Sequence, residues 1–320
     1  MISYAECSAR ERLALLLDAG SFHEWLPPSE RVTSPHLAQL GVPSAFDDGV
    51  AVGRALLDGR AVFVAAQEGE FMGGGVGEVH GAKLVGLLRR ALRDRPAAVL
   101  LLAESGGVRL HEANAGLIAV SEVMRAVLDV RAAGVPVVVL IGGANGCFGG
   151  MGIVARCADR IVMSDVGRLA MSGPEVIEAS HGVEEFDSRD RALVWRTTGG
   201  KHRWLIGDCD ALVEDDVAAF RAAAIDLLAM PDCSAPPTLA TLEAEHAMLD
   251  RRLHALPPQA ADGDADADAD ADGIDTLHAP PAAGDGGTDE AVRLWTALGI
   301  ADAERVPELT VDAVRALRLP

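Results

Sequence analysis

The chain has 320 residues, 49% of them hydrophobic and only 4% aromatic, so it can bury a sizeable core built from Ala, Val, Leu and Ile. Its formal net charge of −20 argues against nucleic acid as a partner. No apolar run reaches the roughly 18–20 residues of a membrane-spanning helix, and the N-terminus has no signal-peptide core, so we expect a cytoplasmic protein without a membrane contact.

Strands and helices are predicted to alternate along the first part of the chain. Two strands, at 50–57 and 61–66, flank Asp58-Gly59, which is a typical hairpin turn. Hydrophobic spacing then predicts, in order, a helix over 84–92, a strand at 97–103, a helix striped by Leu117, Val120, Met124 and Val127, and strands at 135–141 and 160–163. Continuous apolar strands separated by helices are typical of a largely parallel sheet covered on both faces, which is an α/β fold.

The composition changes sharply at Pro257-Pro258. An Asp-Ala repeat followed by Pro and Gly occupies residues 260–287, and its like charges repel one another. Such a segment cannot bury enough apolar surface to offset its ordering entropy, so we predict a disordered linker over 257–288. Helical spacing resumes after it. We therefore expect a domain at 1–256, the linker, and a short helical C-terminal segment at 289–320.

Two glycine-rich segments each follow a predicted buried strand. They are ESGGVRL at 104–110 and GGANGCFGGM at 142–151. Ligands of α/β sheets bind in the crevice beyond the carboxyl ends of the strands, and glycine lets the backbone approach a ligand closely. A helix that starts near Gly149 would add the positive end of its dipole. These features predict an oxyanion hole, and tight turns alone are the alternative interpretation.

Other catalytic templates fit poorly. The sequence has no phosphate-binding G-x-x-x-x-G-K-[ST] motif and no G-x-S-x-G nucleophile elbow. Gly150 to Ala155 loosely matches a dinucleotide fingerprint, but Asp165 follows too soon for the usual helix and strand. The five cysteines form no C-x-x-C pair and the nine histidines show no ligand spacing, so no metal site is predicted.

Read in order, several segments resemble the carboxyltransferases of biotin-dependent acyl-CoA carboxylases, and more closely the malonate decarboxylase β subunits. The segments are SARERL at 8–13 with LDAGSF at 17–22, FMGGGVGEVHGAK at 71–83, ESGGVRL at 104–110, GCFGGM at 146–151, SGPEVIE at 172–178 and FDSRDR at 186–191. The last three point to the decarboxylase branch. The resemblance covers residues 5 to 230 of the chain.

The resemblance implies a crotonase-like fold of repeated ββα units and a set of site residues. The amides of Gly149 and Gly150 would hold an enolate oxygen, and Gly106 and Gly107 would shape the neighbouring pocket wall. Further candidates for substrate contact are Cys147, Phe148, Met151, Val108, Arg109 and His80. For His80, a satisfied structural histidine is the simpler interpretation.

The resemblance also implies an activity and its partners. The chain would be a β subunit that, with a homologous γ subunit, decarboxylates malonyl-S-(acyl carrier protein) to the acetyl form. The substrate would be carried on a phosphopantetheine-type, dephospho-CoA-derived group of the carrier protein, with no cofactor bound directly. A carrier-protein transferase α subunit would be a further partner.

Two alternatives stay open. One is a carboxyltransferase subunit of a biotin-dependent acyl-CoA carboxylase, and the other is a non-catalytic scaffold with a degenerate site. The single-domain acetyl-CoA carboxylase β subunits carry an N-terminal four-cysteine zinc ribbon, whereas only Cys7 stands in that region here, which disfavours this member of the first group.

Overall fold

The computed structural model describes residues 1–39, 41, 49–112, 114–184, 186–230, 233–234, 238–255 and 290–317. The linker predicted at 257–288 lies outside the described residues. None of the helices in the described part is both long and apolar enough to cross a membrane.

A sheet of seven strands lies at the centre of the described residues, with the strands side by side in chain order. The strands are β1 His23–Trp25, β2 Val50–Leu57, β3 Arg60–Gln67, β4 Ala98–Ala103, β5 Val137–Ile141, β6 Arg160–Ser164 and β7 Ala211–Val213. β1 to β3 pair antiparallel, and β3 to β7 pair parallel. The predicted hairpin at Asp58-Gly59 is confirmed, because Leu57 pairs with Arg60 across it.

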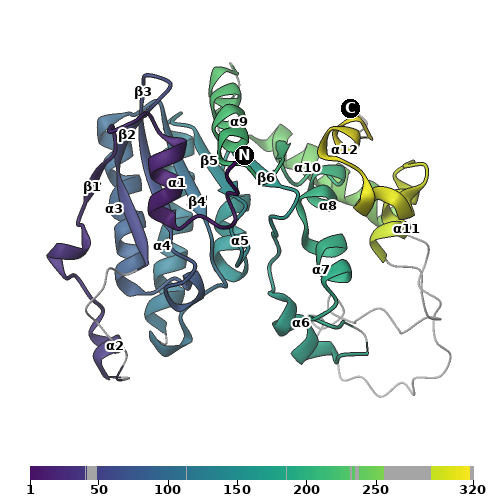
Figure 1. Cartoon of the computed structure of the whole chain (residues 1–320), viewed down its shortest axis with the longest axis horizontal. Helices are drawn as coiled ribbons and strands as arrows, with labels where there is room; N and C mark the ends of the chain where they lie inside the picture. The colour runs from purple at the N-terminus through teal and green to yellow at the C-terminus, as the bar shows by residue number, and fades with distance from the viewer. Residues whose placement is uncertain are drawn as a thin grey trace.

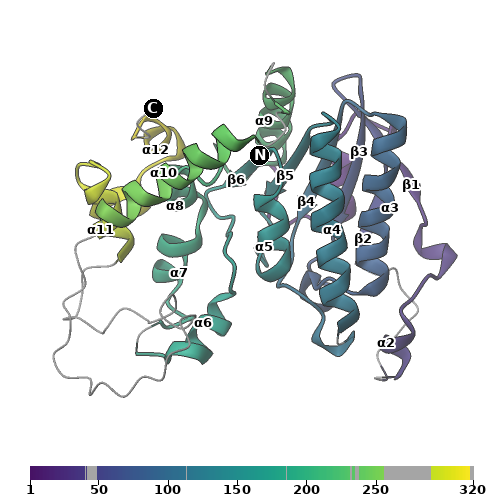
Figure 2. The same ribbon diagram turned by 180° about the vertical axis from the view of Figure 1, so that it is seen from behind.

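Helices cover both faces of this sheet. The helices are α1 Ala9–Leu16, α2 Pro35–Gln39, α3 Glu78–Asp94, α4 Asn114–Ala132, α5 Gly149–Arg156, α6 Pro174–His181, α7 Arg191–Thr198, α8 Gly200–Leu205, α9 Val217–Ala229, α10 Leu239–Ala255, α11 Glu290–Ala297 and α12 Val311–Leu317. Short 3-10 turns span Pro28–Glu30, Met72–Gly74, Leu110–Glu112 and Ala303–Glu308. α3, α4 and α5 lie side by side on one face (Figure 2), and α1 and α9 lie on the other (Figure 1).

The central strands are buried on both faces, which explains their uninterrupted apolar sequences. In β4, Val99 and Leu101 belong to the core cluster under α3, α4 and α5. Leu100 and Leu102 of the same strand belong to the cluster under α1 and α9. All four side chains are at most 2% exposed. The expectation of a sheet covered on both sides is therefore confirmed.

The apolar stripe predicted for the second helix is partly wrong. Val120 and Val127 of α4 are buried, but Leu117 is 57% exposed. The buried face of α4 runs through Val120, Val123, Val127 and Val130, at the alternating spacing of three and four residues that keeps side chains on one side of a helix. Leu117 lies off this line, because it is one residue past the buried Gly116.

The helices of the C-terminal segment pack against the end of the sheet. α11 and α12 lie beside α8 (Figure 1), and a third core cluster joins them to it. In this cluster Trp295 of α11, 1% exposed, packs with Leu205 of α8 and Leu212 of β7. Lys201 of α8 also holds the C-terminal segment, because its Nζ donates to the backbone oxygens of Pro307 and Leu309. The segment thus shares a core with the strands that precede it.

Candidate active site

The two glycine-rich loops lie side by side beyond the carboxyl ends of β4 and β5. The Ser105 N–H donates to the Gly146 oxygen at 2.8 Å, and the Phe148 N–H donates to the Ser105 oxygen at 2.8 Å. Ser105 and Cys147 thereby form an isolated parallel bridge. The convergence expected from the parallel arrangement of the two strands is present in the structure.

A third loop extends this arrangement on the side of β3. The Val76 N–H donates to the Gly107 oxygen at 2.8 Å, and the Arg109 N–H donates to the Val76 oxygen at 3.0 Å. The Gly106 N–H donates to the Gly73 oxygen at 2.8 Å. The Gly107 amide donates to the Ser105 hydroxyl at 3.2 Å, and Gly107 has a φ of +128° that favours glycine. Both of the glycines predicted to form a pocket wall therefore have amides engaged within the loops.

The segment that follows β6 lies on the other side of the second loop. The Cys147 N–H donates to the Arg168 oxygen at 2.8 Å, and the Gly149 N–H donates to the Met171 oxygen at 2.9 Å. Gly149 has a φ of +59°, and a Cβ there would lie 2.9 Å from the Gly107 Cα. In this structure the Gly149 amide is bound to a carbonyl, and glycine is needed here for its conformation and for the close approach of the two loops. The role of this amide as an oxyanion donor stays a prediction.

The free donors lie one and two residues further along, at the start of α5. Within the part of the chain that the structure describes, no oxygen accepts the N–H of Gly150 or Met151, and the N-cap residue Phe148 makes no side-chain cap. The first amides of a helix have no acceptor inside the helix and carry its positive dipole end, so they bind anionic oxygen well. Gly150 is half-buried, and a Cβ there would lie 2.6 Å from Val120 of α4.

Two of the side chains predicted to contact substrate, those of Arg109 and His80, are buried beside other side chains of this protein. The Arg109 guanidinium is 1% exposed, forms an ion pair with Glu112 at 3.2 Å and lies over the Phe71 ring. His80 is fully buried, and its Nε2 is 2.9 Å from the Nε2 of Gln67. Buried side chains with these partners hold the loops in place, and direct substrate contact by Arg109 or His80 stays a prediction.

Most of the other residues predicted to contact substrate are also buried. Cys147, Phe148 and Met151 are at most 3% exposed, and the Phe148 ring lies 5.5 Å from the Arg168 guanidinium carbon. Val108 is half-buried. For these four residues, contact with the substrate stays a prediction. It rests on the backbone at 147–151 and on the Val108 side chain.

The thiol of Cys147 should be chemically inert in the folded protein. Burial raises its pKa to about 12, so almost none of it is thiolate at pH 8, and the thiolate is the nucleophile. We expect N-ethylmaleimide to modify the half-exposed Cys7 and Cys157 first and Cys147 only after unfolding, as read by peptide mass spectrometry. Modification of native Cys147 as fast as Cys157 would contradict this burial.

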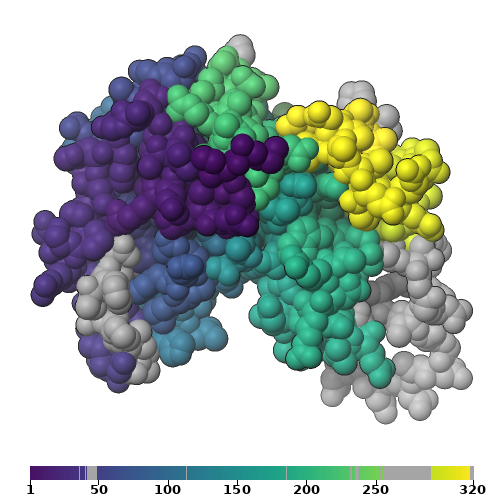
Figure 3. Space-filling view, viewed as in Figure 1, coloured from purple at the N-terminus to yellow at the C-terminus, as the bar shows by residue number. Residues whose placement is uncertain are grey.

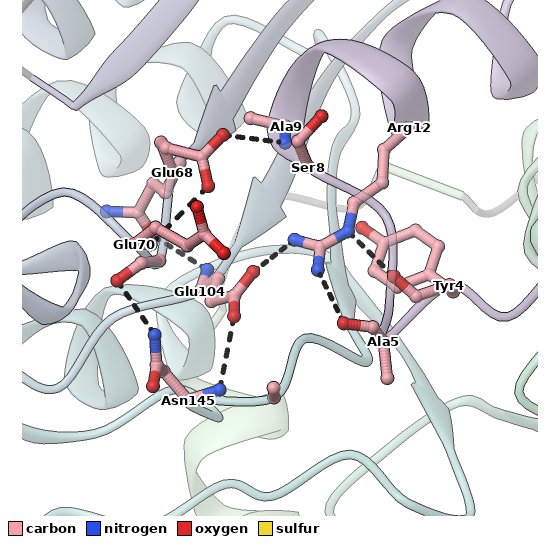
Figure 4. Close-up of polar contacts among 12 residues, drawn as sticks. Tyr4, Ala5, Ser8, Ala9, Arg12, Glu68, Glu70, Glu104 and Asn145 are labelled. Atoms are coloured by element: carbon pink, nitrogen blue, oxygen red, sulfur yellow. Dashed lines mark hydrogen bonds and ion pairs between the residues drawn. The ribbon is translucent and has the colours of Figure 1, made fainter.

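A buried ion pair that the sequence did not predict lies beside the loops. Arg12 of α1 pairs with Glu104, the first residue after β4, and the two side chains are 1% and 6% exposed (Figure 4). The available signal was weak: both residues fall inside segments that carry the family resemblance, but nothing in their spacing joins them. Among the described residues, no group of three or more His, Cys, Asp or Glu side chains is arranged to hold a metal ion.

Comparison with known proteins identifies the family. The carboxyl transferase domain model matches residues 5–265. The chain belongs to the carboxyl transferase family. It is 45% identical over 243 residues to the malonyl-S-ACP:biotin-protein carboxyltransferase of Malonomonas rubra, an alignment that covers 72% of this chain and 76% of that protein. The acetyl-coenzyme A carboxylase carboxyl transferase subunit beta of Fusobacterium nucleatum is 32% identical over 192 residues, 55% of this chain and 59% of the relative.

Solved structures of this family have the same fold. A chain of a Pseudomonas malonate decarboxylase hetero-tetramer, in complex with malonate, superimposes with a TM-score of 0.75 at 37% identity, covering 93% of this carboxyl transferase chain and 97% of that one. The transcarboxylase 12S structure matches with a TM-score of 0.58 at 29% identity over 69% of this chain and 40% of its own. The predicted crotonase-like carboxyltransferase fold is confirmed.

Proposed function

We propose that this chain is the β subunit of a malonate decarboxylase, which with a γ subunit converts malonyl-S-(acyl carrier protein) to acetyl-S-(acyl carrier protein) and CO2. The observation that carries the proposal is the pair of amides at the start of α5, those of Gly150 and Met151, which have no acceptor among the described residues. Similarity to a malonyl-S-ACP carboxyltransferase and to malonate decarboxylase chains supports the choice of substrate.

The chemistry needs stabilisation of negative charge. The bond between the carboxylate carbon and the α-carbon breaks, CO2 leaves, and the electron pair passes into the thioester, which becomes an enolate. A backbone N–H that points at this oxygen lowers the barrier because it interacts more strongly with the enolate than with the neutral thioester. The α-carbon then takes a proton, from water or a side chain, to give the acetyl thioester. The Gly150 N–H is our leading donor, with Met151 beside it.

The carrier protein would present the thioester on its dephospho-CoA-derived arm, so the chain itself binds no cofactor in this proposal.

The proposed γ subunit would form the other side of the substrate pocket. Leu110, Leu117, Ile118 and Met171 come from the segments around the glycine loops and are between 57% and 86% exposed. The surface is also notched between its blue and teal-green parts (Figure 3). Exposed apolar side chains grouped in this way mark protein interfaces, which supports docking of the γ subunit here.

A second candidate has support of its own. The Malonomonas relative is described as transferring from malonyl-S-ACP to a biotin protein. In that reaction the same enolate forms, but the carboxyl group passes to biotin. The two candidates differ only in what receives the carboxyl group, so a biotin trap separates them.

The test uses the chain co-expressed with its γ subunit and carrier protein. We expect the assembled complex to release labelled CO2 from carboxyl-labelled malonyl-S-(acyl carrier protein) without biotin, and avidin to have no effect. For the chain purified alone, we expect the release of labelled CO2 to be near background. Transfer of the label to an added biotin protein, blocked by avidin, would favour the biotin-linked reaction. A complex that neither releases labelled CO2 nor labels a biotin protein would refute both.

A further inference from the structure

Glu104 joins the two glycine-rich loops from inside. It follows β4 directly, and its carboxylate has a partner on each oxygen (Figure 4). Oε2 pairs with Nη1 of Arg12, and Oε1 accepts the backbone N–H of Asn145 at 3.1 Å. The Glu104 N–H donates to the Gln67 side chain at 3.1 Å. One residue therefore contacts the ends of β3, β4 and β5 at once.

The N-terminal segment supplies the positive charge. The Arg12 Nε donates to the Tyr4 backbone oxygen at 2.9 Å, and the guanidinium lies 4.6 Å from the centre of the Tyr4 ring. Ser8 and Glu11 form a capping box that fixes the start of α1, one turn before Arg12. This arrangement gives the SARERL segment a structural role: it places the buried Arg12 guanidinium beside the Glu104 carboxylate.

Glycines close around the carboxylate. A Cβ on Gly69 or Gly143 would overlap the Glu104 side chain, and a Cβ on Gly74 would overlap its backbone oxygen. Asn145 Nδ2 closes the remaining side by donating to the Gly69 oxygen at 2.8 Å. Packing this close leaves no alternative position for the carboxylate, so Glu104 and the loops around it move together.

We propose that Glu104 is a positioning residue: it fixes loop 104–109 against loop 142–149, and through them the direction of the Gly150 amide at the start of α5. As a statement about catalysis, this inference rests on the proposed function. Neutralising this carboxylate removes the ion-pair partner of the buried Arg12 and weakens the hydrogen bond to the Asn145 amide. Small misplacement of a catalytic group lowers the rate far more than it weakens substrate binding.

A second ion pair in the chain serves as a matched control. Asp159 accepts from the Arg131 Nε at 2.9 Å and from the Val137 backbone N–H at 2.8 Å, and its side chain is 2% exposed. It therefore has the same kinds of partner as Glu104. Asp159 directly precedes β6 and bonds to the first residue of β5, at the end of these strands opposite the glycine loops. Asp159→Asn should therefore lower stability without disturbing the site.

The experiment compares Glu104→Gln with Asp159→Asn in the assembled complex. We expect both to lower the melting temperature, but only Glu104→Gln to lower kcat, by about tenfold or more, with KM within about threefold of the wild type. The double variant Arg12→Gln/Glu104→Gln removes both buried charges and should recover part of kcat. A Glu104→Gln complex with wild-type kcat, or an equal loss of kcat in Asp159→Asn, would overturn the inference.

Amide hydrogen exchange gives a readout that does not depend on the reaction. Glu104→Gln should speed exchange within 104–109 and 142–151, whereas Asp159→Asn should leave these segments unchanged. Unchanged exchange in Glu104→Gln would reject the positioning role even if the wild-type complex proved to have another activity. A wild-type complex that releases no CO2, combined with the expected exchange pattern, would reject the proposed reaction and keep the positioning role.

Discussion

Replacing Gly150 by proline in a Val120→Ala background should lower the turnover of malonyl-S-(acyl carrier protein) by about 10²–10³-fold, the usual cost of one lost oxyanion donor. Proline has no N–H, and it is tolerated in the first turn of a helix because that amide has no acceptor in the helix. Gly150 is the second residue of α5, and its φ lies outside the left-handed region. The substitution therefore removes the proposed donor while keeping the helix.

The control for this prediction is Val120→Ala/Gly150→Ala. Any Cβ at position 150 would lie 2.6 Å from a Val120 methyl, and truncating Val120 makes room for it in both variants. The alanine variant keeps the N–H, so its turnover should match Val120→Ala alone. Circular dichroism and assembly with the γ subunit must be equal for the pair. Equal turnover in the two variants would place the oxyanion donor elsewhere, with the Met151 amide the next candidate.

Replacing Trp295 by alanine should destabilise the docking of α11 and α12 by about 3–5 kcal/mol, the range for emptying the site of a large buried aromatic side chain. Trp295 is 1% exposed and packs with Leu205, Leu212 and, at 5.8 Å between ring centres, His202. Because these contacts join the C-terminal helices to α8 and β7, we expect faster amide exchange in residues 290–317 and little change in β4 and β5.

Trp295→Phe is the matched control. Within the described residues the indole Nε1 of Trp295 is buried without a hydrogen-bond partner, so removing the N–H costs no hydrogen bond. Phenylalanine keeps most of the ring, and exchange in 290–317 should stay much closer to the wild type than in the alanine variant. If alanine and phenylalanine gave the same exchange rates as the wild type, Trp295 would not hold these helices.

The sequence by itself determined the features that depend on neighbouring residues. Asp58-Gly59 specified the hairpin, and the apolar runs of β4, β5 and β6 specified buried strands, because turn chemistry and side-chain periodicity act over a few residues. The two glycine-rich loops and the start of α5 at Gly149 were located in the same way. The family was also visible at this level, since its motifs are short and stand in a set order.

Only the tertiary structure decided which groups within those loops are free. Of the two glycine amides predicted as donors, that of Gly149 is bound to the oxygen of Met171, 22 residues later, whereas that of Gly150 has no acceptor among the described residues. Arg109 and His80 turned out to be buried, and Arg12 meets Glu104 across 92 positions of sequence. Hydrogen bonds between distant segments depend on how the strands place their loops, and no local pattern of residues records that placement.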